Sequence, residues 1–316
     1  MKNFALVGAA GYIAERHMRA VKETRNNIAA ACDVFDVMGR MDSYFPDADF
    51  FTDFDLFNNF VAKLKPNPQK IDYFSICSPN HMHRDHILAA LRNNADAICE
   101  KPLVLYPSDI EILKKAEKET GRNVYNILQL RLHPNIIALK EKYSKTNTIH
   151  DIDLTYITSR GKWYSKSWKS EIEKSGGVAT NIGIHFFDML IWIFGNVQSS
   201  TVHIYENNKA AGFLQLEKAR VRWFLSLDFD DLPAEQKEKD IRTFRSIKIE
   251  DNEIEFSEGF ANLHTQSYRN ILNEAGFGIN DSMKSIIITD DIRNTKPIGM
   301  INDYHPILKQ IKLPTY

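Results

Sequence analysis

The segment AICEKPLV, residues 97–104, places a lysine beside a proline at the end of an apolar run. Pro102 has no N–H donor and restricts the residue before it, so a strand that buries residues 97–99 must stop near Lys101. A lysine at a strand tip can stabilise the negative charge that develops on a substrate oxygen. Lys101 is therefore expected at a strand tip, where a ligand could meet its ammonium group.

A second candidate lies in TNIGIHFFDMLIWIFG, residues 180–195. If this segment is helical, Asn181, His185 and Asp188 occupy positions i, i+4 and i+7 and share one face. A histidine is a common general base, whereas an asparagine amide orients a hydroxyl but cannot take its proton. If this face takes part in a reaction, His185 is its candidate base and Asn181 can only orient a hydroxyl. A lone histidine on an apolar helix is more often a core residue; the pairing with Lys101 favours the catalytic reading.

The turn GAAGYIA, residues 8–14, follows an apolar run and precedes a helical pattern. Small residues let the backbone approach a pyrophosphate, and the helix N-terminus supplies N–H donors. The pattern reads G-x-x-G-x-x-A and departs from G-x-G-x-x-G, and similar turns occur without a ligand. The expected cofactor contacts here are Gly8, Ala10, Gly11, Tyr12 and Ile13.

Acidic and polar residues end two further runs. In CDVFD the first choice for gripping the adenosine ribose is Asp33, with Asp36 second, and an acidic residue there favours NAD over NADP. The alternative is that either carboxylate only caps the loop. In CSPNHMH the expected cofactor contacts are Ser78, Pro79 and Asn80, because ligands gather at the carboxyl ends of parallel strands.

The order of apolar runs predicts the elements that position these residues. Runs at 4–9, 28–34, 73–77, 96–100 and 124–130 alternate with helical patterns such as 86–94 and 107–121, which is typical of a doubly wound α/β domain with a parallel sheet. After about Arg131, period-two alternation indicates an antiparallel sheet. We expect an α/β protein with an N-terminal Rossmann domain at 1–126 and a C-terminal α+β domain at 127–316, whose large sheet is mostly antiparallel.

Composition restricts the partners. The 316 residues include 40 basic and 41 acidic side chains, a net charge of -1, which argues against nucleic acid and anionic membranes as partners. Three cysteines and the lack of a signal or transmembrane pattern favour a reduced, cytoplasmic protein. His81, His83 and His86 raise a metal site, but no clear carboxylate or thiolate completes it, so no metal is expected.

The motifs GAAGYIAERH, SPNHMH, CEKPL, LQLRLHP and GGVATNIGIHFFD together resemble the glucose-fructose oxidoreductase, inositol dehydrogenase and MocA family of NAD(P)-dependent sugar dehydrogenases. The resemblance implies that Lys101 lies next to the nicotinamide and the substrate, often with a cis bond to Pro102, and that Lys101 and His185 are the catalytic residues. Base catalysis is expected from His185 with help from Lys101, and which of the two accepts the proton stays open. It adds His83, Glu100, Lys101 and Gln129 to the cofactor side. Many family members have aspartate where this chain has Asn181.

Within the family, LQLRLHP, SRGKWYSKSW and NLHTQSY are most similar to bacterial dehydrogenases that oxidise the C3 hydroxyl of UDP-N-acetyl-glucosaminuronic acid in O-antigen and lipopolysaccharide synthesis. That resemblance implies NAD, a homotetramer and, in some members, 2-oxoglutarate as the hydride acceptor. It implies substrate contacts at Lys101, Arg131, Arg160, Lys162, Trp163, Tyr164, Asn181, His185, His264, Ser267 and Tyr268. By composition alone, the basic and aromatic segment 159–170 suits a solvated loop equally well.

Two other functions compete with this one. A dehydrogenase of a free sugar or cyclitol would keep Lys101 and His185 but would not require uridine. A non-catalytic NAD-binding regulator of the same fold would be expected to lose one of these two residues. Because both are present, catalysis is the leading hypothesis.

Overall fold

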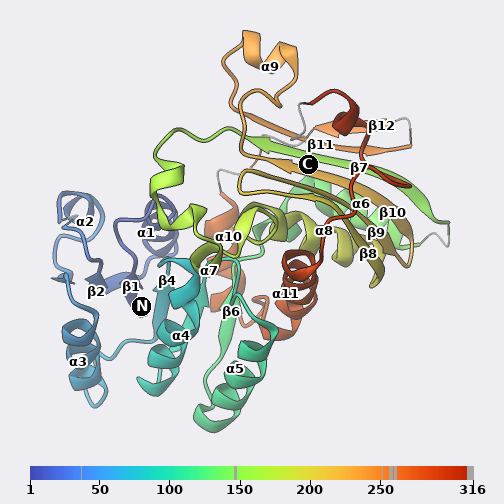
Figure 1. The fold of residues 1–316 in the computed structure, drawn as a ribbon. Helices are drawn as coiled ribbons and strands as arrows, with labels where there is room; N and C mark the ends of the chain where they lie inside the picture. The colour runs from blue at the N-terminus through green and yellow to red at the C-terminus, as the bar shows by residue number, and fades with distance from the viewer. Residues whose placement is uncertain (37, 146–147, 251, 256–258, 260–261, 312–316) are drawn as a thin grey trace. The chain divides into compact units, whose positions relative to one another are not determined.

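The computed structural model describes residues 1–36, 38–145, 148–250, 252–255, 259 and 262–311. The chain forms two compact units, one of Met1–Leu132 with Ala261–Met283 and one of His133–Phe260 with Lys284–Tyr316 (Figure 1). The expected boundary at 126/127 therefore differs from the observed one in two ways. The first unit extends to Leu132. It also includes the later segment Ala261–Met283, whose helix α10 (Leu263–Leu272) packs against α1 (Ala14–Glu23).

The first unit contains a six-stranded parallel sheet in the order β3-β2-β1-β4-β5-β6. Its strands are β1 (Asn3–Val7), β2 (Asn27–Cys32), β3 (Asp49–Phe51), β4 (Tyr73–Ile76), β5 (Asp96–Cys99) and β6 (Val124–Asn126). The near-continuous apolar runs are buried on both faces, as parallel strands require. The order changes direction between β1 and β4, so the carboxyl ends of these strands flank the crevice where such folds bind ligands. This confirms the expected Rossmann domain.

Helices cover both faces of this sheet. In Figure 1, α3 (Phe54–Leu64), α4 (His83–Arg92) and α5 (Pro107–Thr120) lie on one face, and α1 with α10 lies on the other. The short α2 (Met38–Tyr44) and the 3₁₀ turns Asn80–Met82 and Gln129–Leu132 complete the unit. The ends of α5 follow local signals, since Pro107 opens it and Gly121, at a φ of +67°, ends it.

The second unit contains a six-stranded sheet in the order β12-β11-β7-β10-β9-β8. Only β7 and β10 pair in parallel, so the expected mostly antiparallel sheet is confirmed. Its strands are β7 (His150–Thr158), β8 (Val197–Tyr205), β9 (Lys209–Leu216), β10 (Ala219–Ser226), β11 (Thr243–Ile249) and β12 (Asn252–Glu255). Its helices are α6 (Pro134–Ser144), α7 (Ile172–Ser175), α8 (Ile184–Phe194) and α9 (Ala234–Glu238), and α11 (Ile279–Asn294) contains the boundary between the units.

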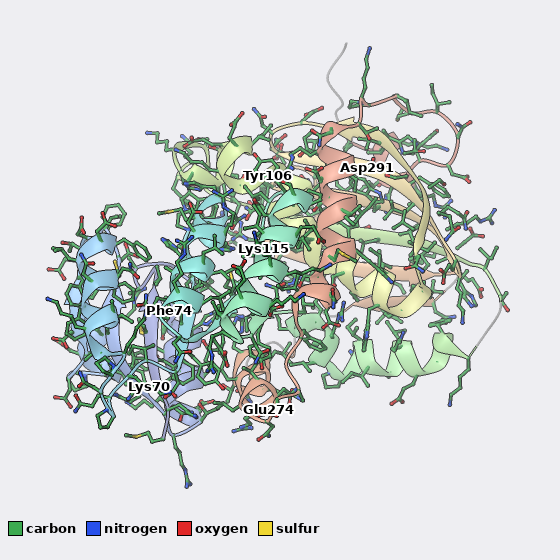
Figure 2. All side chains as sticks on the ribbon, turned by 90° about the horizontal axis from the view of Figure 1, so that it is seen from below. Lys70, Phe74, Tyr106, Lys115, Glu274 and Asp291 are labelled. Atoms are coloured by element: carbon green, nitrogen blue, oxygen red, sulfur yellow. The ribbon has the colours of Figure 1, made fainter. Side chains whose placement is uncertain are left out.

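Each unit has its own apolar interior. Phe74 on β4 is fully buried in the first unit, whereas Lys70, in the connection before it, is exposed (Figure 2). Tyr268 and Ile271 of α10 belong to the core cluster formed by β1, α1 and β2. The late segment is therefore part of the Rossmann core.

The helical run Ile172–Phe194 is long and apolar enough to span a membrane, but 83% of its most apolar window is buried inside the protein. Burial of that kind is typical of a core helix, and α8 packs against α6 within the second unit.

Candidate active site

The turn between β1 and α1 approaches the end of β4 so closely that it has no room for a side chain. Gly8 has a φ of +86°, and a Cβ built on it would lie 2.6 Å from the carbonyl carbon of Cys77 and from the nitrogen of Ser78. A Cβ on Gly11 would lie 3.1 Å from the carbonyl oxygen of Gly8. The first turn of α1 follows directly, with the N–H of Ala14 donating to the carbonyl oxygen of Gly11 at 3.1 Å. This close-packed turn fits the pyrophosphate of a dinucleotide.

Asp33 ties the end of β2 to this turn. One carboxylate oxygen accepts the backbone N–H of Ala10 at 2.8 Å and the other accepts that of Phe35 at 3.1 Å. Asp33 therefore does cap the loop. It also lies at the carboxyl end of β2, where dinucleotide-binding folds hold a ribose, and its contact with the ribose stays a prediction. Sequence reasoning missed Arg40, whose guanidinium donates to the carbonyl oxygens of Ala10 and Gly11, each at 3.3 Å.

The segment after β4 is fixed by two buried histidines. Both ring nitrogens of His83 lie near backbone carbonyls, with Nδ1 2.7 Å from the Pro102 oxygen and Nε2 2.9 Å from the Ser78 oxygen. The hydroxyl of Ser78 lies 2.8 Å from Nδ1 of His86. Burial lowers the pKa of both histidines, that of His86 to about 4, so both rings are neutral at pH 7. A neutral imidazole has one N–H, so His83 donates to one of these two carbonyl oxygens and holds the turn through it, and its expected contact with the cofactor stays a prediction.

Lys101 follows β5 as expected, and its peptide bond to Pro102 is cis, as the resemblance implied. The side-chain amide of Asn126 donates to the carbonyl oxygens of Cys99 at 2.9 Å and of Glu100 at 3.1 Å. The backbone N–H of Lys101 donates to Oε2 of Glu100 at 3.2 Å. The turn from which the lysine side chain departs is thus held from several directions.

The carboxylate of Glu100 faces buried side chains of the first unit, and its expected contact with the cofactor stays a prediction. The side chain of Glu100 is 8% exposed, and Oε1 lies 3.0 Å from Nε2 of His17 and 2.9 Å from Nε2 of His264. Burial alone would raise the pKa of Glu100, but the hydrogen bonds from the two histidines hold this pKa well below its ordinary value. Glu100 is therefore an ionised, buried carboxylate, and His264 is its partner.

Tyr268 and Arg131, both expected to contact substrate, have partners inside the first unit. Tyr268 is fully buried, and its hydroxyl lies 2.7 Å from Nδ1 of His17 and 2.6 Å from Oγ of Ser75. This interior position does not support a substrate contact. The Arg131 guanidinium pairs with Asp281 at 2.9 Å, and the contacts expected of Arg131, Gln129 and Ser267 stay predictions.

The second unit holds His185 and Asn181, but the helix that carries them is not regular. A π-helical turn, Ala179–Gly183, precedes α8, and the register therefore changes between Asn181 and His185. The amide of Asn181 donates to the hydroxyl of Tyr164 at 3.1 Å. Gly176 and Gly177, with φ of +81° and +75°, precede this turn, and a Cβ on Gly177 would clash with the Tyr205 hydroxyl. π-Helical turns are frequent at functional sites.

The basic and aromatic segment gathers unpaired cations. Nζ of Lys169 lies 5.3 Å from the ring centre of Trp163 and 5.7 Å from that of Trp168. Burial, and then the charge of Arg160, lower the pKa of Lys169. Within the part of the chain that the structure describes, no acidic side chain pairs with Arg160, Lys162 or Lys169. Sequence reasoning placed Lys169 in this loop but did not select it as a contact.

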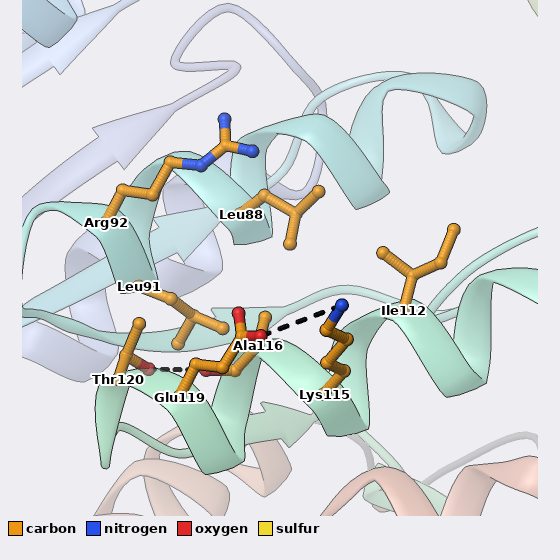
Figure 3. A pocket seen from close by; sticks show the side chains of 8 residues that line it. All are labelled: Leu88, Leu91, Arg92, Ile112, Lys115, Ala116, Glu119 and Thr120. Atoms are coloured by element: carbon orange, nitrogen blue, oxygen red, sulfur yellow. Dashed lines mark hydrogen bonds and ion pairs between the residues drawn. The ribbon is translucent and has the colours of Figure 1, made fainter.

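A surface groove elsewhere in the first unit contains none of the candidate site residues. It has a volume of about 240 Å³ and lies between α4 and α5, and Figure 3 shows Lys115 paired with Glu119 on its wall. Arg92 and Thr120, at the carboxyl ends of the two helices, also line it. In a βαβ unit these helix ends lie at the amino edge of the sheet, opposite to the ligand-binding edge.

Comparison with known proteins agrees with this geometry. Residues 2–127 match the oxidoreductase family with an NAD-binding Rossmann fold, and residues 147–231 match the C-terminal alpha/beta domain of that family. The protein is 28% identical to 2,7-anhydro-N-acetylneuraminate hydratase of Escherichia coli over 45% of this chain and 38% of that protein. It is 26% identical to inositol 2-dehydrogenase of Salmonella typhimurium over 62% of this chain and 55% of that protein. The chain thus spans well under two thirds of these curated relatives.

Two solved structures of the WlbA (WbpB) dehydrogenase from Thermus thermophilus are similar over nearly the whole length. Each is 46% identical, covers 97% of this chain and 99% of its own, and superposes with a TM-score of 0.94. One holds NAD and UDP-GlcNAcA, and the other holds NAD and alpha-ketoglutarate. The WlbA dehydrogenase from Bordetella pertussis, at 17% identity and a TM-score of 0.75, shares the fold. The chain belongs to the glucose-fructose oxidoreductase, inositol dehydrogenase and MocA family of oxidoreductases, with its NAD-binding Rossmann domain and its C-terminal alpha/beta domain.

Proposed function

We propose that this protein is an NAD-dependent dehydrogenase that oxidises the C3 hydroxyl of UDP-N-acetyl-glucosaminuronic acid to a ketone, a step in the synthesis of O-antigen and lipopolysaccharide sugars. The observation that carries the proposal is the 46% identity, over 97% of the chain, to an enzyme whose structure holds NAD and this nucleotide sugar. The side chains that such a reaction needs are present, with Lys101 after β5 and His185 on α8.

In this mechanism the substrate loses a hydride from C3 and a proton from the C3 hydroxyl. Bound NAD supplies the hydride acceptor. His185 or Lys101 takes the proton, and the charge of Lys101 stabilises the alkoxide character of the transition state. Asn181, held by Tyr164, orients a substrate hydroxyl without taking its proton.

The unpaired cations of the second unit suit the substrate's anionic groups. A uridine diphosphate and a uronate carboxylate both require donors, and charge-assisted hydrogen bonds from Arg160, Lys162 and Lys169 would satisfy them. Trp163 is half exposed, at 52%, and offers a ring face on which a uracil base can stack. A free sugar or cyclitol would leave these cations unmatched.

The decisive assay incubates the protein with NAD, 2-oxoglutarate and UDP-N-acetyl-glucosaminuronic acid that carries deuterium at C3. We expect a 3-keto sugar without the deuterium and 2-hydroxyglutarate that has gained it, because the same cofactor molecule is reduced and then reoxidised. Deuterium retained at C3 in every product would contradict the mechanism. Turnover of myo-inositol or free glucose, with none of the nucleotide sugar, would favour the cyclitol or free-sugar alternative.

We further propose that the enzyme acts in the cytoplasm as a homotetramer. Its three cysteines are all free and buried, which suits a reducing compartment. Light scattering at micromolar concentration tests the assembly, and a monomer would contradict this part of the proposal.

A further inference from the structure

The carboxylate of Glu100 is the meeting point of a buried hydrogen-bond chain within the first unit. Oε1 accepts from Nε2 of both His17 and His264, and Oε2 accepts the backbone N–H of Lys101. The three side chains are 0% (His17), 3% (His264) and 8% (Glu100) exposed. They come from α1, from α10 and from the turn after β5.

The rest of the chain follows from the donors. Because an ionised carboxylate only accepts, Nε2 of His17 must carry a proton, and Nδ1 of the neutral ring is then an acceptor. The hydroxyl of Tyr268, at 2.7 Å, therefore donates to Nδ1 and accepts in turn from Ser75, at 2.6 Å. Ser75 donates to Tyr268, Tyr268 donates to His17, and His17 donates to Glu100. The carboxylate is therefore the final acceptor of this series of hydrogen bonds.

A buried charge of this kind is not expected to increase the stability of the fold over that of an apolar side chain. The cost of removing a carboxylate from water is large, and apolar side chains of similar size often replace a buried charged group without loss. The Glu100 carboxylate accepts the backbone N–H of the next residue, Lys101. The side-chain amide of Asn126 donates to the carbonyl oxygens of Cys99 and Glu100. What the chain of hydrogen bonds fixes is the backbone from which the lysine side chain departs.

We propose that His17, His264 and Tyr268 are positioning residues, which act through Glu100 to hold the Lys101 turn in the geometry that the dehydrogenase reaction needs. This inference rests on the proposed function, because measuring kcat requires the proposed substrate. A second test measures the chemical reactivity of Lys101 and requires no substrate. A displacement of about 1 Å at a catalytic group is enough to cost roughly a hundredfold in rate.

A metal ion is the competing account of the same three residues, because one ligand atom of each lies within 4.8 Å of the others. A metal would need both Nε2 atoms without protons, and Oε1 of Glu100 would then lose both of its donors. The short contacts of 3.0 Å and 2.9 Å are ordinary hydrogen bonds and are explained without it.

The test compares Glu100→Gln, Tyr268→Phe, His264→Leu and His264→Gln with wild type. The Gln amide at 264 can place an N–H near the position of Nε2, whereas Leu cannot. We expect Glu100→Gln and His264→Leu to lower kcat about ten- to a hundredfold with the KM for NAD changed less than about threefold. His264→Gln should recover most of the activity that His264→Leu loses, and Tyr268→Phe should lie between.

The matched control is Thr265→Val, next to His264. Its hydroxyl donates to Glu23 of α1 at 2.7 Å, so the variant removes a hydrogen bond between the same two helices without touching Glu100. It should lose thermal stability but keep kcat. Equal loss of kcat in Thr265→Val and His264→Leu would reduce the network to helix packing and overturn the proposal.

A second readout does not depend on the substrate. The rate at which Lys101 reacts with an amine reagent, followed by peptide mass spectrometry, should change severalfold in Glu100→Gln and stay unchanged in Thr265→Val. Unchanged reactivity of Lys101 in Glu100→Gln overturns the proposal, even if the nucleotide sugar proves not to be the substrate. One equivalent of metal in the purified protein, lost in His264→Leu, would overturn it in favour of the metal site.

Discussion

The carboxylate of Asp33 accepts the backbone N–H of Ala10 at 2.8 Å and so joins the end of β2 to the glycine turn. A negative charge at this point repels the 2′-phosphate of NADP, whereas the ribose hydroxyls of NAD can donate to it. We expect NAD(H) to bind more tightly than NADP(H), and Asp33→Ala to weaken NAD binding about tenfold and to reduce the preference. Calorimetry with both dinucleotides measures this. Equal affinities in the wild-type protein would remove Asp33 from its role.

Substitution of Gly8 should be severe. Its φ of +86° and the approach of Cys77 and Ser78 to 2.6 Å leave no place for a methyl group next to rigid backbone. Gly8→Ala is expected to destabilise the protein by about 2 kcal/mol or more and to abolish NAD binding. The control is Gly39→Ala, at a helical position with no atom within 4 Å of the added Cβ, which should be neutral or slightly stabilising. Denaturant titration and cofactor fluorescence distinguish the two variants.

Lys169 should contribute to substrate binding more than to chemistry. The cation lies between two tryptophan rings and near Arg160, so an anionic ligand would relieve the repulsion. Lys169→Met is expected to raise the KM for the nucleotide sugar about tenfold and to leave kcat within about threefold. The exposed Lys166 in the same loop provides the control, and Lys166→Met should change neither constant. A larger effect on kcat than on KM in Lys169→Met would refute this assignment.

The two proposed catalytic side chains should affect turnover and not cofactor binding. Lys101→Met and His185→Gln are each expected to lower kcat by about a hundredfold or more, because they act on charge that develops only in the transition state. The Kd for NAD should stay within about threefold of wild type. Single-turnover kinetics and NAD titration on the same samples test this, and full activity in either variant would exclude that residue from the reaction.

Buried neutral histidines predict a loss of stability in mild acid. Burial lowers the pKa of His86 from 6.5 to about 4 and also lowers that of His17 and His83. Below pH 6.5 the unfolded chain takes up protons that the folded chain refuses, so the free energy of unfolding falls as the pH drops. His86 alone can lower the free energy of unfolding by roughly 3 kcal/mol when the pH falls from 7 to 4.

Urea titrations at pH 7.5, 6.0 and 5.0 measure this slope. The His86→Gln variant, which removes one of these groups, should show a shallower slope than wild type. A free energy of unfolding that does not change between pH 7.5 and 5.0 would contradict the neutral, buried state of these rings.

The sequence predicted the parts of the site that local patterns encode. The glycine turn, the strand ends and the interruption before Pro102 all follow from steric rules that act over a few residues. The partners of Glu100 do not, because His17 and His264 lie 83 and 164 positions away and nothing in the apolar periodicity says which buried polar groups will meet. Tyr268 was expected at the substrate only because the resemblance implied it, yet its hydroxyl contacts His17 and Ser75 in the interior.

The register of the helix that bears His185 shows a second limit. A spacing of four residues implies a shared face only if every turn is α-helical, and the π-helical turn at Ala179–Gly183 breaks that assumption. Sequence patterns give no clear signal for a single inserted residue. The position of His185 on α8 could be predicted, whereas its orientation relative to Asn181 could not.

The return of residues 261–283 to the Rossmann unit has a consequence for synthesis of the chain on the ribosome. A nascent chain released up to Leu132 has all six strands of the parallel sheet, but Tyr268 and Ile271, which close the core over β1 and α1, have not yet been made. His17 and Glu100 would meet each other with neither Tyr268 nor His264 in place. The first unit therefore begins to be synthesised before the second, but its core can be completed only after the segment from His133 to Phe260 and then α10 have been translated.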